Sequence, residues 1–149
     1  IIAFSIFNFG KYSYWLILFC FLNFGTTDMI SSHLIKKNVE RLRPCRDEAI
    51  VSKNILVRCG SGYSFTSSHA TNHFGLATFL SFTLGIFIKK IRIPLFLWAG
   101  IISLSQVYVG VHFPLDVLCG SIIGISIGLV WSKIFMKYYS YIFNREAIV

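Results

Sequence analysis

The chain has 149 residues, of which 55% are hydrophobic and 17% are aromatic. Only 13% are charged, about half of the ~25% that is usual in soluble domains, and the mean hydropathy is +0.68. This composition argues against a soluble enzyme and indicates one integral-membrane domain over residues 1–149. The formal net charge of +8 suits anionic lipid or phosphate, whereas nucleic acid is disfavoured because the basic residues are not interleaved with solvent-facing aromatic ones.

Four segments are apolar and long enough to span a bilayer, which takes about 20 residues. We expect these spans from Tyr12 to about Ile35 with a polar helical continuation toward Leu42, from Ser68 to about Ile88, from Ile93 to about Gln106 or as far as Tyr108 or Gly110, and from Pro114 to about Phe135. Residues 1–9 read as the tail of a further helix whose start precedes this sequence. The predicted fold class is therefore an all-α, polytopic transmembrane helix bundle with about five helices.

Alternation of the spans places the long polar loop 44–66 and the turn 110–113 on one side of the membrane, opposite the basic loop 89–92. Lys and Arg are equally numerous on the two sides, so the positive-inside rule gives no orientation by itself. We expect the 44–66 side to face away from the cytoplasm, because its basic residues include the candidate phosphate ligands described below.

Two of the four cysteines, Cys45 and Cys59, lie in this polar loop. In an outward-facing, oxidising space they could form a disulfide, and otherwise they are two free thiols. Cys20 and Cys119 lie within apolar spans and read as packing residues.

Lys36 and Arg43 form the first of three polar clusters at helix ends on this side. Residues seven positions apart lie on one face of a helix, so the two cations could grip a phosphate together. Pro44 would then end that helix. Alternatively, both residues are interfacial side chains that extend their charges to water.

Ser67, Ser68 and His69 form the second cluster, at the start of the second predicted span. A Ser before an apolar run is typical of an N-cap, and the free N–H groups of a helix N-terminus suit an anion. His69 would lie in the first turn, beside a bound phosphate. Alternatively, this is an ordinary cap followed by an interfacial histidine.

His112, Pro114 and Asp116 form the third cluster. Pro114 fits the first turn of a helix, and Asp116 follows His112 at a spacing that lets the two side chains meet. The carboxylate could orient the imidazole and leave its other nitrogen free to attack. An acid inside an apolar span is a functional candidate by default, although the pair could also be a structural hydrogen bond.

Small residues continue both of these helices at four-residue intervals. Gly120, Gly124 and Gly128 follow Asp116, while His73, Ala77, Ser81 and Gly85 follow His69. Small residues at this spacing let membrane helices approach closely. We therefore expect the two helices to pack together and to bring their histidines to one site.

In this order, the three clusters resemble the type 2 phosphatidic acid phosphatase family, whose signature is K-x(6)-R-P, then P-S-G-H, then S-R-x(5)-H-x(3)-D. The resemblance spans about Gly25 to Gly128. The matching residues are Lys36, Arg43 and Pro44 in the first motif, Ser67 and His69 in the second, and Ser105, His112 and Asp116 in the third. Thr66, Ser68 and Gln106 stand where the family has Pro, Gly and Arg.

The resemblance implies a lipid phosphatase that uses neither a metal nor a cofactor. His112 would attack phosphorus and form a phosphohistidine, oriented by Asp116, while His69 would protonate the leaving group. The residues that would hold the phosphoryl oxygens are Lys36, Arg43, Ser67, Gln106 and the backbone at Ser68.

The family also implies six helices in the full protein and a location in a bacterial inner membrane, with the site facing the periplasm or cell exterior. The substrate would be a lipid phosphate or diphosphate in the surrounding membrane. Small bacterial members favour undecaprenyl diphosphate, with phosphatidylglycerophosphate, phosphatidic acid and a lipid A phosphate as alternatives. The sequence does not predict an oligomeric state.

The departures from the signature have physical consequences. Gln106 keeps a hydrogen-bond donor but lacks the fixed charge and bidentate fork of Arg, which Arg41 or Arg46 could replace. Ser68 adds a side chain where Gly allows close backbone approach.

Two other functions compete with this reading. One is a pseudo-enzyme that binds a phospholipid headgroup without turnover, and Gln106 is its support. The other is a transporter with a proton relay that includes Asp28 and His33. We expect instead that Asp28 is a buried partner that orients Lys36, since Asp28, Ser32 and Lys36 follow at four-residue steps.

Overall fold

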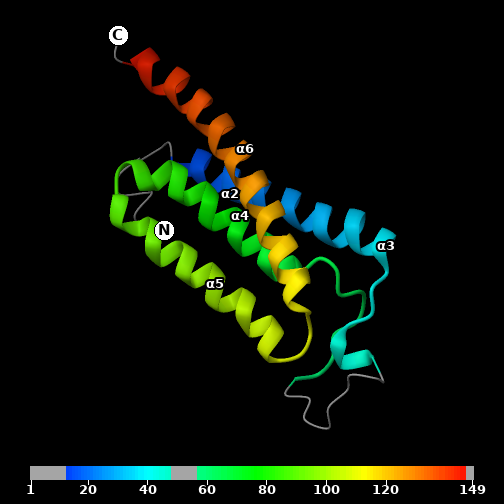
Figure 1. The fold of residues 1–149 in the computed structure, drawn as a ribbon. Coiled ribbons are helices and arrows are strands. Elements are labelled where there is room, and N and C mark those ends of the chain that lie inside the picture. Colours follow the sequence, from blue (N-terminus) through cyan, green and yellow to red (C-terminus); the bar gives the residue numbers. More distant parts are fainter. Residues whose placement is uncertain (1–12, 48–56, 147–149) are drawn as a thin grey trace.

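The computed structural model describes residues 13–47 and 57–146, with only the backbone described from residue 140 onward. Every regular element in these ranges is helical, which confirms the all-α fold class (Figure 1). The main elements are α2 (Ser13–Asp28), a π-helical segment (Met29–Ile35), α3 (Lys36–Val39), α4 (Ser68–Thr83), α5 (Arg92–Tyr108) and α6 (Pro114–Glu146). The expected helical tail over residues 1–9 lies outside the described residues.

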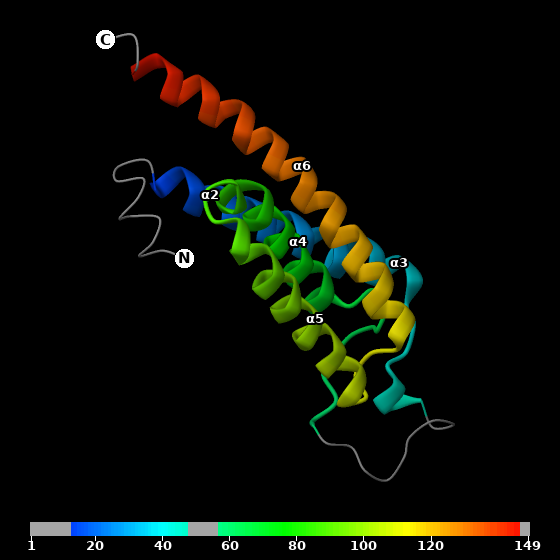
Figure 2. The ribbon, with the colours of Figure 1, turned by 60° about the vertical axis from the view of Figure 1, so that its left-hand side comes forward.

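Three helical stretches are long and apolar enough to cross a membrane. They are Ser13–Val39, Lys89–Tyr108 and Pro114–Tyr139. Helix α4 is the central element and contacts α2, α5 and α6 (Figures 1 and 2). Their outer faces expose large apolar side chains, such as Phe21 on α2 and Ile101 on α5, as expected of surfaces that meet lipid. The chain is therefore an integral membrane protein.

The first span ends earlier than its sequence predicts. Glu40 adopts a left-handed conformation with φ of 51°, which ends α3 at Val39 rather than near Leu42. Arg43 is extended (φ −77°, ψ 149°), as is typical of a residue before proline, and Pro44 begins a short 3-10 turn. The predictions that Lys36 and Arg43 share one helix face, and that Pro44 ends that helix, were therefore wrong.

Glycines of α6 lie directly against the backbone of α4. The nearest α4 atoms to a Cβ built on Gly120, Gly124 and Gly128 are the carbonyl oxygens of Ser67, Thr71 and Gly75. A side chain at any of these glycines would force the helices apart, so the predicted close packing is confirmed. A backbone hydrogen bond also joins the starts of the two helices, since the Ser67 N–H donates to the Asp116 carbonyl at 3.1 Å.

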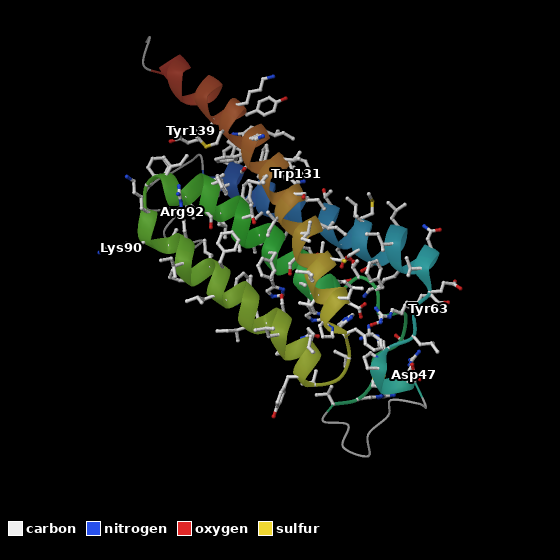
Figure 3. The ribbon with its side chains drawn as sticks, viewed as in Figure 1. Asp47, Tyr63, Lys90, Arg92, Trp131 and Tyr139 are labelled. Carbon is white, nitrogen blue, oxygen red and sulfur yellow. A yellow bond between two sulfur atoms is a disulfide. The ribbon has the colours of Figure 1, made fainter. Side chains whose placement is uncertain are left out.

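Aromatic packing fixes the middle and far end of the bundle. Phe19 of α2, Phe79 of α4 and Phe135 of α6 meet with ring centroids 5.3–6.4 Å apart. Tyr139 packs on Phe135 and extends this cluster toward the end that carries Lys90 and Arg92 (Figure 3), while Trp131 packs on Phe19. Asp47 and Tyr63, in the described parts of the polar loop, lie at the opposite end of the bundle (Figure 3), as the alternation of spans predicts.

Helix α6 differs most from its predicted length. It runs without a break to Glu146, well past the expected end near Phe135, and extends beyond the rest of the bundle (Figure 2). Helix α4 is shorter than expected, because Leu84–Ile86 forms a 3-10 turn instead of a last α-helical turn. Neither difference alters the polar end of the molecule, where the three clusters lie.

Candidate active site

A tight turn between α5 and α6 positions His112. The backbone N–H groups of Val111 and His112 both donate to the Gln106 carbonyl, at 3.2 and 3.1 Å. Gly110 has a φ of 74°, which glycine adopts without steric cost. The turn leaves His112 only 2% exposed, two residues before the first residue of α6, Pro114.

Asp116 is fully buried, and its carboxylate is surrounded by donors. One oxygen accepts from Arg41 Nη1 at 2.9 Å. The other accepts from the Phe113 N–H at 2.9 Å and from the Ser64 hydroxyl, and lies 3.6 Å from His112 Nδ1. The predicted contact between Asp116 and His112 is thus confirmed. Because Nδ1 faces the carboxylate, Nε2 is the nitrogen available for attack.

Burial and the Asp116 carboxylate shift the pKa of His112 in opposite directions. Burial lowers the pKa of His112 below its ordinary value of 6.5, and the positive charges of Arg43 and Lys36 lower it further. The negatively charged carboxylate of Asp116, 3.6 Å from Nδ1, raises this pKa without cancelling the effect of burial. The imidazole is therefore neutral at pH 7, the state that a nucleophile needs.

Ser67 caps α4, as the sequence predicts. Its backbone is extended (φ −70°, ψ 110°), and its hydroxyl accepts from the Ala70 N–H at 3.4 Å. His69 follows in the first turn and is exposed, in contrast to His112. The Ser67 N–H donates to the Asp116 carbonyl at 3.1 Å, so the first turn of α4, which carries His69, lies at the same end of the bundle as His112 and Asp116.

Lys36 and Arg43 reach this region from separate elements. Lys36 begins α3 and is partly buried, whereas Arg43 lies beyond the helix and donates through Nε to the Gly62 carbonyl at 3.3 Å. The charges of both residues act on His112. The fold thus brings the predicted cations near the histidines, although not by the shared helix face that their spacing suggested.

The Ser68 side chain turns into the interface between helices. Its hydroxyl lies 3.1 Å from that of Ser31 and 3.0 Å from that of Ser32, both in the π-helical segment. The extra side chain, which replaces the family's glycine, is therefore held by the neighbouring helix.

Asp28 lies beside this hydroxyl cluster. Its carboxylate accepts from Ser32 at 3.2 Å and from Asn72 Nδ2 at 3.3 Å, so Asp28 is partly buried and faces α4 rather than lipid. Its charge also acts on Lys36, but its hydrogen bonds go to Ser32 and Asn72, which corrects the expectation that Lys36 is its direct partner. Gln106, whose side chain donates to Ser105 Oγ at 3.3 Å, stays a predicted ligand.

A disulfide joins Cys45 to Cys59, which settles the alternative that the sequence left open. Cys20 and Cys119 are free, as expected. The bond ties the segment that follows Arg41 to the segment that precedes Ser64. The disulfide therefore stabilises the loop whose residues Arg41 and Ser64 bind Asp116.

Sequence reasoning missed Ser64 entirely. Ser64 is fully buried, and its N–H donates to the Arg41 carbonyl at 2.7 Å. It lies in an irregular loop, so no periodicity marks it, and it has no place in the family signature. In the part of the chain that the structure describes, no cluster of three or more His, Cys, Asp or Glu side chains could hold a metal ion.

Comparison with known proteins gives consistent results. The sequence model of the PAP2 superfamily matches residues 13–140. Two similar curated proteins are lipid A 4'-phosphatases. That of Bacteroides thetaiotaomicron is 33% identical over 123 residues, which cover 76% of this chain and 53% of the relative. That of Porphyromonas gingivalis is 30% identical over 116 residues, covering 73% and 46%. The chain thus spans about half the length of these relatives.

A solved structure is similar as well. It is the crystal structure of a transmembrane PAP2-type phosphatidylglycerolphosphate phosphatase from Bacillus subtilis. It shares 28% sequence identity, superposes with a TM-score of 0.67, and the match covers 91% of this chain and 65% of that one. Together with the fold and the polar end of the bundle, these matches show that the chain belongs to the PAP2 superfamily.

Proposed function

We propose that this chain is an integral-membrane lipid phosphatase, which releases phosphate from a lipid phosphate or diphosphate through a phosphohistidine intermediate. The observation that carries the proposal is the buried pair of His112 and Asp116, with Nδ1 of the ring 3.6 Å from the carboxylate. A buried carboxylate that faces one imidazole nitrogen prepares the other for nucleophilic attack. Membership of a superfamily with named lipid phosphatases supports the same reading.

The reaction would proceed in two displacements. Nε2 of His112 attacks phosphorus, the bond between phosphorus and the lipid oxygen breaks, and His69 donates a proton to that oxygen. Asp116 stabilises the positive charge that develops on the imidazole. Water then attacks the phosphohistidine, giving up a proton to His69, and phosphate leaves with His112 restored.

Charge on the transferred phosphoryl group has to be stabilised by the protein, since none of these steps uses a metal. Lys36 and Arg43 carry the positive charge that acts on both histidines. The remaining proposed ligands of the phosphoryl oxygens are Ser67, the Gln106 amide and the backbone N–H at Ser68. The start of α4 supports this arrangement, because a helix N-terminus favours an anion.

The substrate is proposed from relatives. Similarity to two lipid A 4'-phosphatases favours a phosphate monoester on a saccharolipid. Undecaprenyl diphosphate, phosphatidylglycerophosphate and phosphatidic acid stay alternatives, and the fold neighbour makes phosphatidylglycerophosphate worth including in any panel. All four are anionic lipids whose phosphate lies at the membrane surface. The polar end of the bundle would lie at the same depth and could therefore contact the phosphate.

The direct test is phosphate release from this lipid panel by the purified protein in detergent, with and without a chelator. We expect release from at least one lipid, unaffected by the chelator. His112→Ala should abolish it, while the exposed His33 provides a matched control in His33→Ala. Full activity in His112→Ala would refute the mechanism, and activity that disappears with the chelator would refute its metal-free character.

A headgroup-binding protein without turnover is the second candidate, and Gln106 in place of Arg is the observation that favours it. This candidate predicts that the wild-type protein binds a phospholipid but releases no phosphate. It also predicts that Gln106→Arg creates activity. Phosphate release by the wild-type protein would exclude it.

The membrane and orientation are proposed as a bacterial inner membrane with the site facing the periplasm. The disulfide supports this, because it lies at the site's end of the bundle and such bonds persist in oxidising spaces. Lys90 and Arg92 mark the opposite end (Figure 3). In a background without Cys20 and Cys119, a membrane-impermeant maleimide should label Ser61→Cys in spheroplasts and Lys90→Cys only after lysis. The reverse pattern would invert the orientation.

A further inference from the structure

The third motif of this chain lacks a cation. Gln106 stands where the family signature has Arg, and its amide group donates to the neighbouring Ser105 hydroxyl at 3.3 Å. A glutamine cannot supply a fixed charge or a bidentate fork. If the chain is a phosphatase, as proposed above, some other residue has to provide positive charge beside the His112–Asp116 pair.

Arg41 occupies that place. Its Nη1 lies 2.9 Å from Asp116 Oδ1, and its guanidinium carbon lies 3.8 Å from the centroid of the Phe113 ring. The guanidinium is thus fixed by an ion pair and by stacking on an aromatic face. The Arg41 side chain nevertheless keeps 35% of its surface exposed, whereas Asp116 is fully buried.

The fold brings Arg41 to Asp116 by ending the first span early. Because the helix stops at Val39 and Glu40 is left-handed, Arg41 lies in an irregular segment. The Arg41 carbonyl accepts from the Ser64 N–H at 2.7 Å, and Ser64 in turn donates through its hydroxyl to Asp116. The backbone of Arg41 is therefore held by the same loop that holds the carboxylate.

We propose that Arg41 is a positioning residue that takes over the charge missing at position 106. The guanidinium binds Oδ1 of Asp116, so that Oδ2 faces His112 Nδ1, and it adds a fixed positive charge next to the nucleophile. A charge held rigidly beside the reacting group costs no reorganisation during the reaction, which is where it stabilises a transition state.

The test compares charge and shape at position 41 in the purified protein, with the lipid that the wild type hydrolyses best. Arg41→Gln keeps donors but removes the charge, and should lower kcat on the order of 10²-fold with less change in KM. Arg41→Lys keeps the charge without the fork, and should retain more activity than Arg41→Gln. Arg58→Gln, which removes an exposed arginine with no proposed role at the site, should leave kcat unchanged.

The decisive variant is the double substitution Arg41→Gln with Gln106→Arg. Because it restores a cation at the family's position, the double variant should have a kcat at least about tenfold higher than that of Arg41→Gln alone. A structural role for Arg41 would not be rescued from position 106, so failure of this rescue in a folded protein would overturn the proposal. Unchanged kcat in Arg41→Gln would overturn it as well.

Folding is followed in each variant by its thermal unfolding midpoint. If Arg41→Gln does not fold, the comparison passes to Arg41→Lys with and without Gln106→Arg, and a lack of any gain from the added arginine counts against the proposal. Inactivity of the wild-type protein across the whole panel would instead contradict the proposed function, so the two failures are distinguishable.

Discussion

The buried hydroxyl of Ser64 donates a hydrogen bond to the carboxylate of Asp116, 52 residues further along the chain. The same hydroxyl lies 3.5 Å from Nδ1 of His112. Ser64 thus touches both members of the proposed catalytic pair and connects them to the disulfide-braced loop. The geometry of the pair depends on this loop as well as on the start of α6.

Ser64→Ala should lower kcat by about 10- to 100-fold, because a hydrogen bond to a charged group contributes roughly 1.5–3 kcal/mol. The loss should fall mainly on kcat, since Ser64 is not expected to touch the lipid. Steady-state kinetics of phosphate release measures it. Ser126→Ala is the matched control, because that exposed hydroxyl bonds only within α6, to the Ile122 carbonyl. Equal kinetics for the two variants would show that Ser64 does not orient the pair.

Gly124→Ala should destabilise the protein by roughly 1–3 kcal/mol, the usual result of overpacking. A Cβ at this position would meet backbone atoms of Thr71 and Gly75, which cannot move without shifting α4. Gly100→Ala in α5 is the control, since nothing lies within 4 Å of its added Cβ. Thermal unfolding in detergent should show a lower midpoint for the first variant only. A midpoint for Gly124→Ala as high as the control's would contradict the close packing of α4 and α6.

The pH dependence follows from the lowered pKa of His112. Attack requires the neutral imidazole, so the acid limb of kcat/KM should have its midpoint below the ordinary 6.5. The unfolded chain binds a proton more readily than the folded one, so stability is complete above pH 6.5 and is lost as pH falls through the folded pKa.

Thermal midpoints of the wild type and His112→Gln, measured across this range, isolate the contribution of His112 to stability. The difference between the two proteins should change below pH 6.5, with the wild type losing stability as the pH falls. A constant difference at every pH, or an acid limb with a midpoint well above 6.5, would show that burial does not govern this imidazole.

Ser68→Gly restores the family's residue and should leave kcat within about threefold of the wild type, because the Ser68 side chain is directed toward Ser31 and Ser32. Stability should fall by about 1–2 kcal/mol, through lost hydroxyl contacts and the lower helix propensity of Gly. Kinetics and thermal unfolding of the same preparation test both parts. A large rise in kcat would mean that the Ser68 side chain obstructs the phosphate.

Replacing Cys45 and Cys59 together by Ser should lower the thermal midpoint by roughly 5–10 °C, because a cross-link over a loop of this length contributes about 3 kcal/mol. The disulfide closes a separation of 14 residues. Reductant should destabilise the wild type similarly and leave the double variant unchanged. Cys20→Ala with Cys119→Ala keeps the bond and should respond to reductant like the wild type. A wild type that is insensitive to reductant would contradict a structural role for the bond.

Several features were predictable because they depend on neighbours in the sequence. Pro114 begins α6 and Ser67 caps α4 as expected, since a proline at the first turn and a capping hydroxyl act within a few residues. The contact of His112 with Asp116 is also local, because one turn of chain separates them. The packing face of α6 could be predicted as well, because its glycines recur at four-residue intervals along one helix.

Other features were not predictable from local pattern. A helical spacing suggested that Lys36 and Arg43 share a face, yet the left-handed Glu40 ends the helix between them. Nothing in the polar loop marks Ser64 as a partner of Asp116, since irregular segments carry no periodicity. The direction of the Ser68 side chain depends on hydroxyls of another helix.

The sequence by itself determined that this is an all-α membrane protein and which polar residues lie at the ends of its helices. It also determined that Asp116 can reach His112. Short-range sterics and the exclusion of polar groups from lipid decide these properties, and both act over a few residues or one span. Only the tertiary structure decided that Arg41 and Ser64 complete the surroundings of Asp116. Those contacts join an irregular loop to a distant helix, so they exist only after the chain has folded.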